Sequence, residues 1–528
     1  MAEHRSRYGK GCLYRTPMVV GPTREELEEL SVELDLGLKG SPELRDYQSA
    51  IDDIVRGINE LDELVEPTTL VKYPRTPGQR PSKDSNPHNA WYYKSTITGA
   101  SNGKLSGKRV AIKDSIAVAG IPMMMGCHAL EGYVPDFDAT VVTRVLDAGG
   151  VILGKATSED NCVSGSSYTS AFGPVSNPYD DTHVAGGSSS GSAVLVAKNE
   201  VDLAIGGDQG GSVRIPASWC GLVGLKPTFG LVPYTGAGSG ELTLDHLGPI
   251  TRSVEDCALM LEAIAGYDDG RDPRQPCNID VPNYTKHLKD MKPETISVAV
   301  LKEGFGQDCS DPAVDRIVTD TIDRFAAASG ATVSPTSMPL HRFGRQLGLP
   351  ITIIGGLDCA MNSGGAGLHH TGYYPTSMMK ILATQFQQHK SKLAPLNKLL
   401  FLSGTYLKRN YCSLYGKAQN LRQLLTQQME EALQGHDVIA MPTIPFTAPK
   451  IPSGEATEKE ILEVSNNMLT NVKVSNLTGH PSITINVGLV GGLPVGLQLT
   501  GKKFGELRLL QIAQAFEEFV NAQPEQDA

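Results

Sequence analysis

The chain has 528 residues, of which 40% are hydrophobic, so it is long enough to bury the core of one oversized α/β domain or of roughly three domains. Its 58 acidic residues outnumber its 47 lysines and arginines, and the formal net charge of -11 argues against a protein that binds nucleic acid or an anionic membrane surface. The nine cysteines form no C-x-x-C pair, so we expect neither a disulfide framework nor a zinc site. No run approaches the roughly 18 apolar residues of a membrane span, and residues 1–7 lack the apolar core of a secretion signal, so we expect a cytoplasmic protein.

Residues 1–66 are predicted to form a helical N-terminal arm. Thr23-Arg24-Glu25-Glu26 is a capping box, and leucines follow it at helical spacing until Gly37. A second helix is expected to open at Ser41-Pro42, with these apolar residues on one stripe: Leu44, Tyr47, Ile51, Ile54, Ile58 and Leu61. The periodicity leaves open whether the arm packs on the main body or forms the interface of a homodimer.

Residues 67–107 are predicted to be an extended linker. Five prolines there remove backbone donors and restrict their neighbours: Pro67, Pro74, Pro77, Pro81 and Pro87. The core domain is expected to follow the linker and to span residues 108–528.

The first part of the core alternates strands and helices. Residues 108–113 read as a strand, 138–146 as an amphipathic helix, 151–153 as a strand and 201–205 as a buried strand. This alternation favours an α/β fold, with a large parallel or mixed sheet covered by helices on both faces.

The second part of the core continues the pattern after residue 266. Strands are predicted over 296–300 and 438–442, with a helix over 311–328 and a helix-rich insertion over about 340–434. Residues 482–485 and 495–499 suggest an antiparallel pair, and 507–520 a closing amphipathic helix.

Two segments rich in glycine and serine, residues 185–194 and 206–218, flank the strand predicted over 201–205. Neither has the G-x-x-x-x-G-K-[ST] of a phosphate-binding loop, a good dinucleotide fingerprint, or the G-x-S-x-G of an α/β-hydrolase. A serine-histidine triad is possible in principle, but His183, His246 and His480 read as structural or rim residues. The remaining hypothesis is a serine nucleophile with a lysine base.

Ser212 is the candidate nucleophile. It follows two glycines, so its hydroxyl can sit on a tight turn whose N–H groups point at a developing oxyanion. A lysine serves as base only when it is neutral, and burial lowers a lysine pKa by up to about 3–5 units. Lys113, at the end of a predicted strand, is placed to be buried in this way.

Long stretches around these residues carry a family resemblance. They are Val110-Ala111-Ile112-Lys113-Asp114, Gly186-Gly187-Ser188-Ser189 and Gly210-Gly211-Ser212-Val213-Arg214-Ile215-Pro216-Ala217. Together they resemble the amidase signature family, and the similarity extends to Gly224-Leu225-Lys226-Pro227-Thr228 and Gly492-Leu493-Pro494-Val495-Gly496, so it covers most of the chain. With its helical arm, the chain looks closest to the bacterial amidases associated with nitrile hydratase.

The resemblance implies a role for each of three residues. Ser212 would be the acylated nucleophile, Ser188 a bridging serine joined to Gly187 through a cis peptide, and Lys113 the base. The resemblance also implies that the backbone N–H groups of Gln209, Gly210, Gly211 and Ser212 hold the oxyanion.

Other residues near these candidates read as structural. Ser189 is expected to hold the loop by hydrogen bonds as well as to border the substrate site. Asp208 and Arg214 are expected to form a structural ion pair around Ser212. The remaining interpretations are packing or an acyl-pocket wall for Met123-Met124-Met125, small buried hydrophobes for Cys162 and Cys220, and a possible substrate contact for Tyr168.

The resemblance implies an amidase that converts small aliphatic or aromatic carboxamides to acid and ammonia without metal or cofactor. We expect a small-molecule amide as substrate, no nucleic-acid or membrane partner, and a homodimer. One alternative is the amidase subunit of a tRNA-dependent amidotransferase. Another is a non-catalytic, amidase-like binding scaffold.

Overall fold

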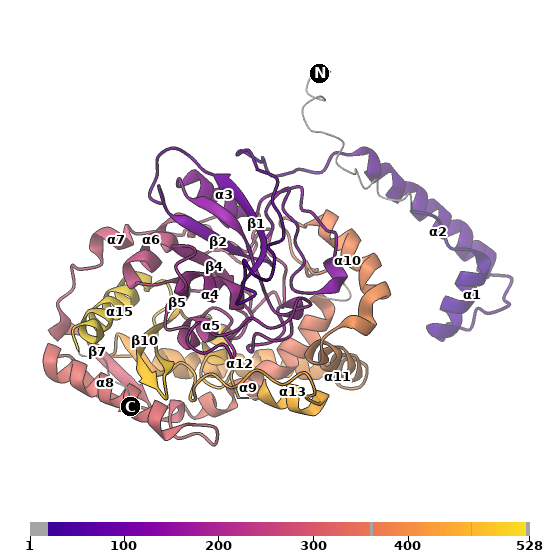
Figure 1. Cartoon of the computed structure of the whole chain (residues 1–528). Coiled ribbons are helices and arrows are strands. Elements are labelled where there is room, and N and C mark those ends of the chain that lie inside the picture. Colours follow the sequence, from indigo (N-terminus) through magenta and orange to yellow (C-terminus); the bar gives the residue numbers. More distant parts are fainter. Residues whose placement is uncertain (1–18, 360–362, 466, 524–528) are drawn as a thin grey trace. The chain divides into compact units, whose positions relative to one another are not determined.

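The structure is a computed structural model that describes residues 19–359, 363–465 and 467–523 (Figure 1). Residues 1–7, and Cys12 among the nine cysteines, lie outside the described residues. The chain divides into two units, Met1–Thr69 and Leu70–Ala528, and each is described by itself.

The described part of the first unit, residues 19–69, contains two helices and a short 3-10 turn, α1 (Arg24–Glu33), α2 (Leu44–Asn59) and η1 (Glu60–Glu63). The predicted capping box is confirmed, since the Thr23 hydroxyl accepts from the Glu26 N–H at 3.2 Å and the Glu26 carboxylate accepts from the Thr23 N–H at 2.7 Å. The second helix begins at Leu44 rather than at Ser41-Pro42, because the Leu44 N–H closes a turn on the Ser41 carbonyl.

The strands of the described second unit form one mixed sheet in the order β1-β3-β2-β4-β6-β5-β10-β11-β9-β7-β8. Strand β2 pairs in parallel with β3 and β4, and β7 pairs in parallel with β8 and β9, while the other neighbours are antiparallel. The bounds are β1 (Trp91–Thr98), β2 (Arg109–Lys113), β3 (Val151–Ala156), β4 (Leu203–Gly207), β5 (Val223–Lys226), β6 (Leu247–Thr251), β7 (Ser297–Leu301), β8 (Thr332–Thr336), β9 (Val438–Pro442), β10 (Ser482–Val490) and β11 (Leu493–Gly501). The predicted mixed sheet and the late antiparallel pair are confirmed.

The prediction of an extended linker over residues 67–107 was wrong for its second half. Residues Trp91–Thr98 form β1, which pairs with β3 at the edge of the sheet. The five prolines all precede this strand, so the residues that lack a backbone donor end before the ladder begins. The segment before β1 is also held, because the Tyr93 hydroxyl donates to the Gly78 carbonyl and Gln79 bridges to Lys94.

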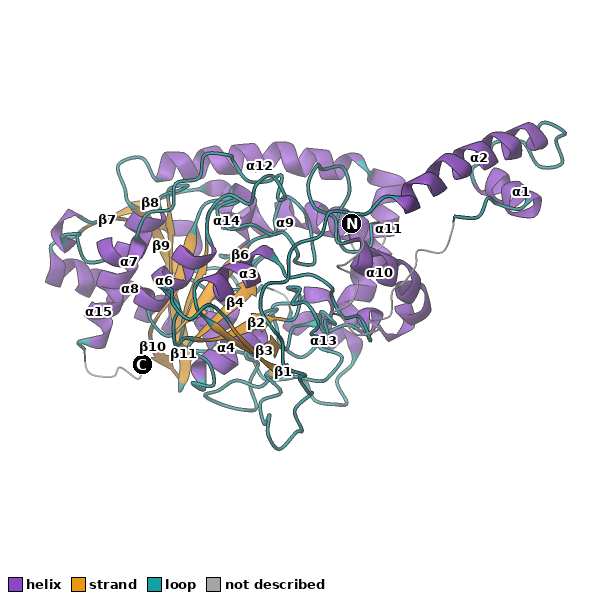
Figure 2. Ribbon diagram, turned by 90° about the horizontal axis from the view of Figure 1, so that it is seen from above, coloured by secondary structure: helices purple, strands orange, loops and turns teal. Residues whose placement is uncertain are grey.

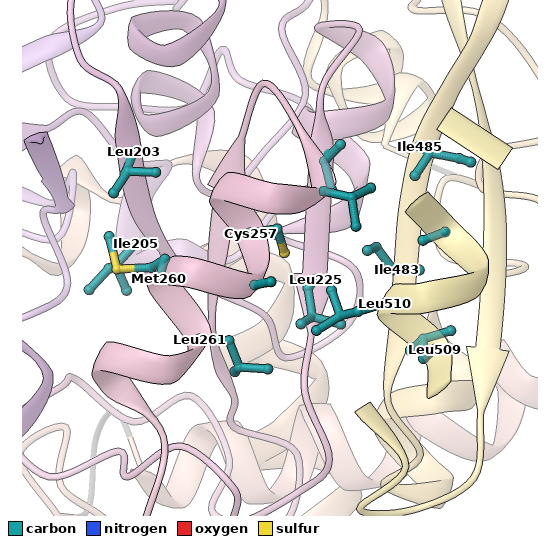
Figure 3. Packing of buried hydrophobic residues seen from close by; sticks show 14 of the residues in the cluster. Leu203, Ile205, Leu225, Cys257, Met260, Leu261, Ile483, Ile485, Leu509 and Leu510 are labelled. Atoms are coloured by element: carbon teal, nitrogen blue, oxygen red, sulfur yellow. The ribbon is translucent and has the colours of Figure 1, made fainter. Parts of the chain in front are cut away.

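Helices cover both faces of the sheet (Figure 2), as the alternation of apolar side chains along its strands requires. In β4, Leu203 and Ile205 belong to one hydrophobic cluster and Ala204 to the other. In Figure 3, side chains of α6 and α15 pack on strands β4, β5 and β10. The helices on this face are α3 (Thr140–Asp147), α6 (Val254–Ile264), α8 (Pro312–Ser329) and α15 (Glu506–Asn521). Those on the other face are α4 (Ser190–Ala197), α5 (Arg214–Trp219) and α12 (Ser413–Ala432).

Most of the described chain between β8 and β9 is helical. Its elements are η6 (Pro339–Phe343), α9 (Gly344–Pro350), the π-helical turn η7 (Ile351–Gly355), α10 (Thr376–His389), η9 (Lys390–Lys392), α11 (Pro395–Tyr411) and α12. The remaining short elements are η2 (His128–Leu130), η3 (Asp160–Cys162), α7 (Tyr284–His287), η4 (Pro293–Thr295), η5 (Lys302–Gly304), α13 (Glu458–Val464) and α14 (Lys473–Thr478). No helix in the described part of the chain is both long and apolar enough to cross a membrane.

Candidate active site

Lys113 is the last residue of β2, and its side chain is completely buried. Strands β2 and β4 are parallel neighbours, so their carboxyl ends share one edge of the sheet. There the Lys113 Nζ lies 2.7 Å from Ser188 Oγ and 3.2 Å from the Gly207 carbonyl oxygen. Burial lowers the pKa of Lys113, although Cys162 and Asp208 act in the opposite direction. The site therefore favours the neutral amine more than water does.

The first glycine-serine segment places Ser188 against this amine. The peptide bond Gly187–Ser188 is cis, as the resemblance implied. The Gly187 N–H donates to the Gly165 carbonyl at 2.7 Å, and helix α4 begins two residues after Ser188. These contacts fix both sides of Ser188, whose own side chain is fully buried.

Ser189 holds the two segments together. Its hydroxyl donates to the Gly207 carbonyl and accepts from the Gly207 N–H, both at 3.2 Å, and the residue is fully buried. The loop-holding interpretation of Ser189 is therefore confirmed. That it also borders the substrate site stays a prediction, since Ser189 is as fully buried as its neighbour Ser188.

The second glycine-serine segment carries Ser212, which is 8% exposed, whereas Ser188 is fully buried. Gly211 has a φ of +115°, a value that favours glycine, and a Cβ at this position would lie 2.4 Å from Val472 Cγ2. The glycine therefore serves both the turn before Ser212 and the close packing behind it.

The backbone N–H groups of this turn differ in their partners. The Gly211 N–H donates to Asp208 Oδ1 at 2.7 Å, so the prediction that it holds an oxyanion was wrong: a carboxylate already occupies it. Within the described residues, the N–H groups of Gln209, Gly210 and Ser212 donate to no protein acceptor. Three of the four predicted donors are therefore free to bind an oxygen from outside the chain.

Asp208 and Arg214 form the predicted ion pair and are both fully buried. The guanidinium donates to both carboxylate oxygens at 3.1 Å. Burial alone would raise the pKa of Asp208, but Arg214, Asn476 and Lys226 together outweigh it and hold that pKa below its ordinary value. Asp208 also accepts from the Val213 N–H, so the charged pair fixes the backbone on both sides of Ser212.

Several other predicted residues have structural roles. Met123, Met124 and Met125 are buried, which fits the packing interpretation. The Tyr168 hydroxyl lies 2.5 Å from the Ile461 carbonyl and 2.9 Å from Ser465 Oγ. Cys220, His246 and His480 are buried, as expected of structural residues. Cys162 is only partly buried, and it lies near enough to Lys113 to raise the pKa of that lysine.

Three residues that the sequence analysis did not single out also reach the nucleophile loop, here defined as residues 208–212. Asn476 donates to the Asp208 carbonyl and carboxylate, and Lys473 donates to the Gln209 carbonyl. The Tyr234 hydroxyl accepts from Gln209 Nε2 at 2.7 Å. No local signal in the sequence pointed to them; in the structure Lys473 and Asn476 are polar residues within the buried helix α14.

Comparison with known proteins extends these observations. The Amidase family matches residues 80–510. The chain is 38% identical over 510 residues to an enantioselective amidase of Rhodococcus rhodochrous, covering 95% of this chain and 96% of the relative. It is 37% identical over 426 residues to one subunit of the glutamyl-tRNA(Gln) amidotransferase of a Nostoc species, covering 80% of this chain and 85% of that relative.

A solved structure agrees with these relatives. The peptide amidase of Stenotrophomonas maltophilia has a TM-score of 0.64 and 28% identity, covering 80% of this chain and 84% of that one. The fold and these matches define the class of the protein, an amidase. The chain belongs to the amidase signature family, as its motifs indicated.

Proposed function

We propose that this amidase hydrolyses small aliphatic or aromatic carboxamides to carboxylic acid and ammonia through an acyl-enzyme on Ser212. The observation that carries the proposal is the 2.7 Å contact between Lys113 Nζ and Ser188 Oγ, made by a fully buried lysine next to the turn that bears Ser212. A neutral amine in hydrogen-bond contact with a serine is a competent proton acceptor at the start of a relay.

Acylation follows from this relay. Lys113 takes the proton of the Ser188 hydroxyl as Ser188 takes that of Ser212, and Ser212 Oγ bonds to the amide carbonyl carbon. The carbonyl electron pair moves to oxygen, where the N–H groups of Gln209, Gly210 and Ser212 stabilise the charge. When the carbon–nitrogen bond breaks, Ser188 returns the proton to the leaving nitrogen and is itself reprotonated by Lys113.

Deacylation uses the same groups. A water molecule replaces the departed ammonia and gives its proton to Lys113 through Ser188 while its oxygen bonds to the acyl carbon. The bond to Ser212 Oγ then breaks, and the proton returns along the relay to Ser212. The products are the carboxylic acid and the free enzyme.

The proposal is tested by measuring ammonia release from benzamide and propionamide by the purified protein. We expect release from at least one of the two, since the relative similar over 95% of this chain is an amidase. A broader panel with other aliphatic, aromatic and amino-acid amides then defines the acyl group. Absence of ammonia across the whole panel would refute the hydrolase.

The amidotransferase relatives define a second candidate, an amidase subunit that releases ammonia from glutamine for a partner. Similarity to the enantioselective amidase covers more of this chain, 95% against 80%, which favours the free amidase. Glutaminase activity that requires added amidotransferase subunits, with no activity on simple amides, would favour the second candidate. Ligand binding without turnover of any amide would favour a scaffold.

We also propose that α2 mediates a homodimer. Within the first unit, side chains on its predicted apolar stripe are left uncovered, including Tyr47, Ile54 and Ile58. A two-helix unit cannot bury such a stripe by itself, and a second copy offers an identical one.

The dimer is tested by light scattering. We expect the wild type to have about twice the chain mass of 56.4 kDa and Ile54→Glu together with Ile58→Glu to have the mass of one chain, because two charges on the stripe oppose its burial. Asp53→Asn, on the polar face of α2 where Asp53 pairs with Arg56, is the matched control and is expected to remain dimeric. A monomeric wild type would overturn this proposal.

A further inference from the structure

Lys473 occupies a slot behind the nucleophile loop. It is the first residue of α14, and its side chain is 4% exposed. Its Nζ donates to the Gln209 carbonyl at 3.1 Å and to the Thr352 Oγ1 of η7 at 2.8 Å. The ammonium is therefore held at two points, one on the nucleophile loop and one on the helical segment after β8.

Two glycines make room for this side chain. A Cβ at position 348 would lie 2.6 Å from Lys473 Cε, and a Cβ at position 210 would lie 3.2 Å from Cδ. Contacts under 3.0 Å force a neighbour to move, so a side chain at position 348 would displace the lysine. The slot is thus shaped for an unbranched chain that ends at the Gln209 carbonyl.

The peptide that Lys473 holds contains one of the free N–H groups. The cis bond of the described residues is Gly187–Ser188, so the peptide Gln209–Gly210 is trans. In a trans peptide the C=O and the N–H point in opposite directions. The ammonium on the Gln209 oxygen therefore directs the Gly210 N–H away from Lys473. A charged donor on the carbonyl also polarises the peptide, which strengthens its N–H as a donor.

We propose that Lys473 is a positioning residue of the amidase reaction, which orients and polarises the Gln209–Gly210 peptide so that the Gly210 N–H stabilises the oxyanion. This inference rests on the proposed function of the same site. It adds a residue that touches neither the substrate nor the serines and acts only through a backbone group.

The charges around Lys473 give the reaction a pH signature. Burial lowers the pKa of Lys473 to about 8, with Arg422 acting in the same direction, while Glu241, Asp208 and Asp245 act to raise it. Above this pKa the amine loses its charge and polarises the peptide less. We therefore expect kcat to decline as the pH rises through about 8 in the wild type.

The test compares Lys473→Met with the wild type, because methionine keeps an unbranched stem and removes the charged donor. We expect kcat for benzamide to fall about 10²-fold, at the lower end of the loss for one oxyanion donor, with KM changed less than about threefold. Affinity for benzaldehyde, which forms a tetrahedral adduct with a serine nucleophile, is expected to fall by the same factor as kcat/KM. The decline of kcat near pH 8 is expected to disappear.

Two further variants separate positioning from folding. Lys473→Arg keeps a charge that does not titrate, so it is expected to recover kcat to within about tenfold of the wild type and to lack the decline near pH 8. Lys226→Met removes another fully buried lysine, one that donates to the Pro227 and His480 carbonyls. We expect the ratio of benzaldehyde affinity to KM for benzamide to be the same in this variant as in the wild type.

The outcomes are distinct for the two proposals. A wild type that releases no ammonia from any amide overturns both the amidase reaction and the role of Lys473. An active wild type whose Lys473→Met variant keeps kcat and benzaldehyde affinity overturns the positioning role alone. If Lys473→Met does not fold, a Lys473→Arg variant that still shows the decline near pH 8 overturns it as well.

Discussion

Replacing Ser212 with alanine is expected to lower kcat for the best amide substrate by at least about 10⁴-fold, because the variant lacks the atom that forms the acyl-enzyme. The structure of the turn is expected to survive, since the backbone around Ser212 is fixed by the Asp208 carboxylate rather than by the serine hydroxyl. Ammonia release and circular dichroism measured on the same preparation check both parts of the prediction.

Covalent labelling identifies the nucleophile directly. A fluorophosphonate is expected to add to the peptide that contains Ser212 in the wild type and to leave the Ser212→Ala protein unlabelled. Ser190→Ala is the matched control, because Ser190 lies in the other glycine-serine segment and, among the described residues, its hydroxyl makes only a 3.5 Å contact with the Thr157 carbonyl. Labelling of a cysteine, or full activity in Ser212→Ala, would show that the nucleophile is another residue.

Replacing Lys113 with methionine is expected to lower kcat by about 10²–10⁴-fold, the range for loss of a general base. Methionine fills most of the buried space without carrying a proton. In the wild type, kcat/KM is expected to rise with pH as Lys113 loses its proton, since only the neutral amine accepts one. Burial lowers the pKa of Lys113, so this rise occurs below the ordinary lysine value of about 10.4.

The pH profile of the variant is the decisive measurement for Lys113. The residual activity of Lys113→Met is expected to lack the rising limb, and fluorophosphonate labelling of Ser212 is expected to be lost at neutral pH. A variant that keeps the rising limb would assign the base to another group. Lys155→Met is not a clean control, because Lys155 donates to the carbonyl of Asp114, the residue next to Lys113.

The sequence predicted most of the fold, because its strands are short apolar runs that end in glycine or charge. Residues 108–113 and 201–205 are of this kind, and they overlap strands β2 and β4 to within two residues. Strand β1 was missed because five prolines come just before it and its own sequence, Trp91–Thr98, mixes aromatic and polar residues, as suits an edge strand. The proline content averaged over residues 67–107 concealed the boundary between the last proline, Pro87, and the start of β1 at Trp91.

The candidate site was predicted less evenly. The contact between Lys113 and Ser188 could be predicted because each residue lies in its own short motif of the family, over 110–114 and 186–189. The occupied N–H of Gly211 was not predictable, because it depends on where the Asp208 carboxylate points. Lys473 was missed for a related reason: it lies 264 residues from Gln209, and only the fold brings the two together.

The distance along the chain between the nucleophile loop with the adjoining Arg214 and the residues that hold them has a consequence for synthesis. Arg214 is held by Ser475, Asn476 and Gln498, partners 261 to 284 residues further on, and the Gln209 carbonyl is held by Lys473. A growing chain on the ribosome has made Lys113, Ser188 and Ser212 long before these partners emerge. We therefore expect amide hydrolysis to begin only when nearly the whole chain has been made and folded, and chains that end before α14 to be inactive.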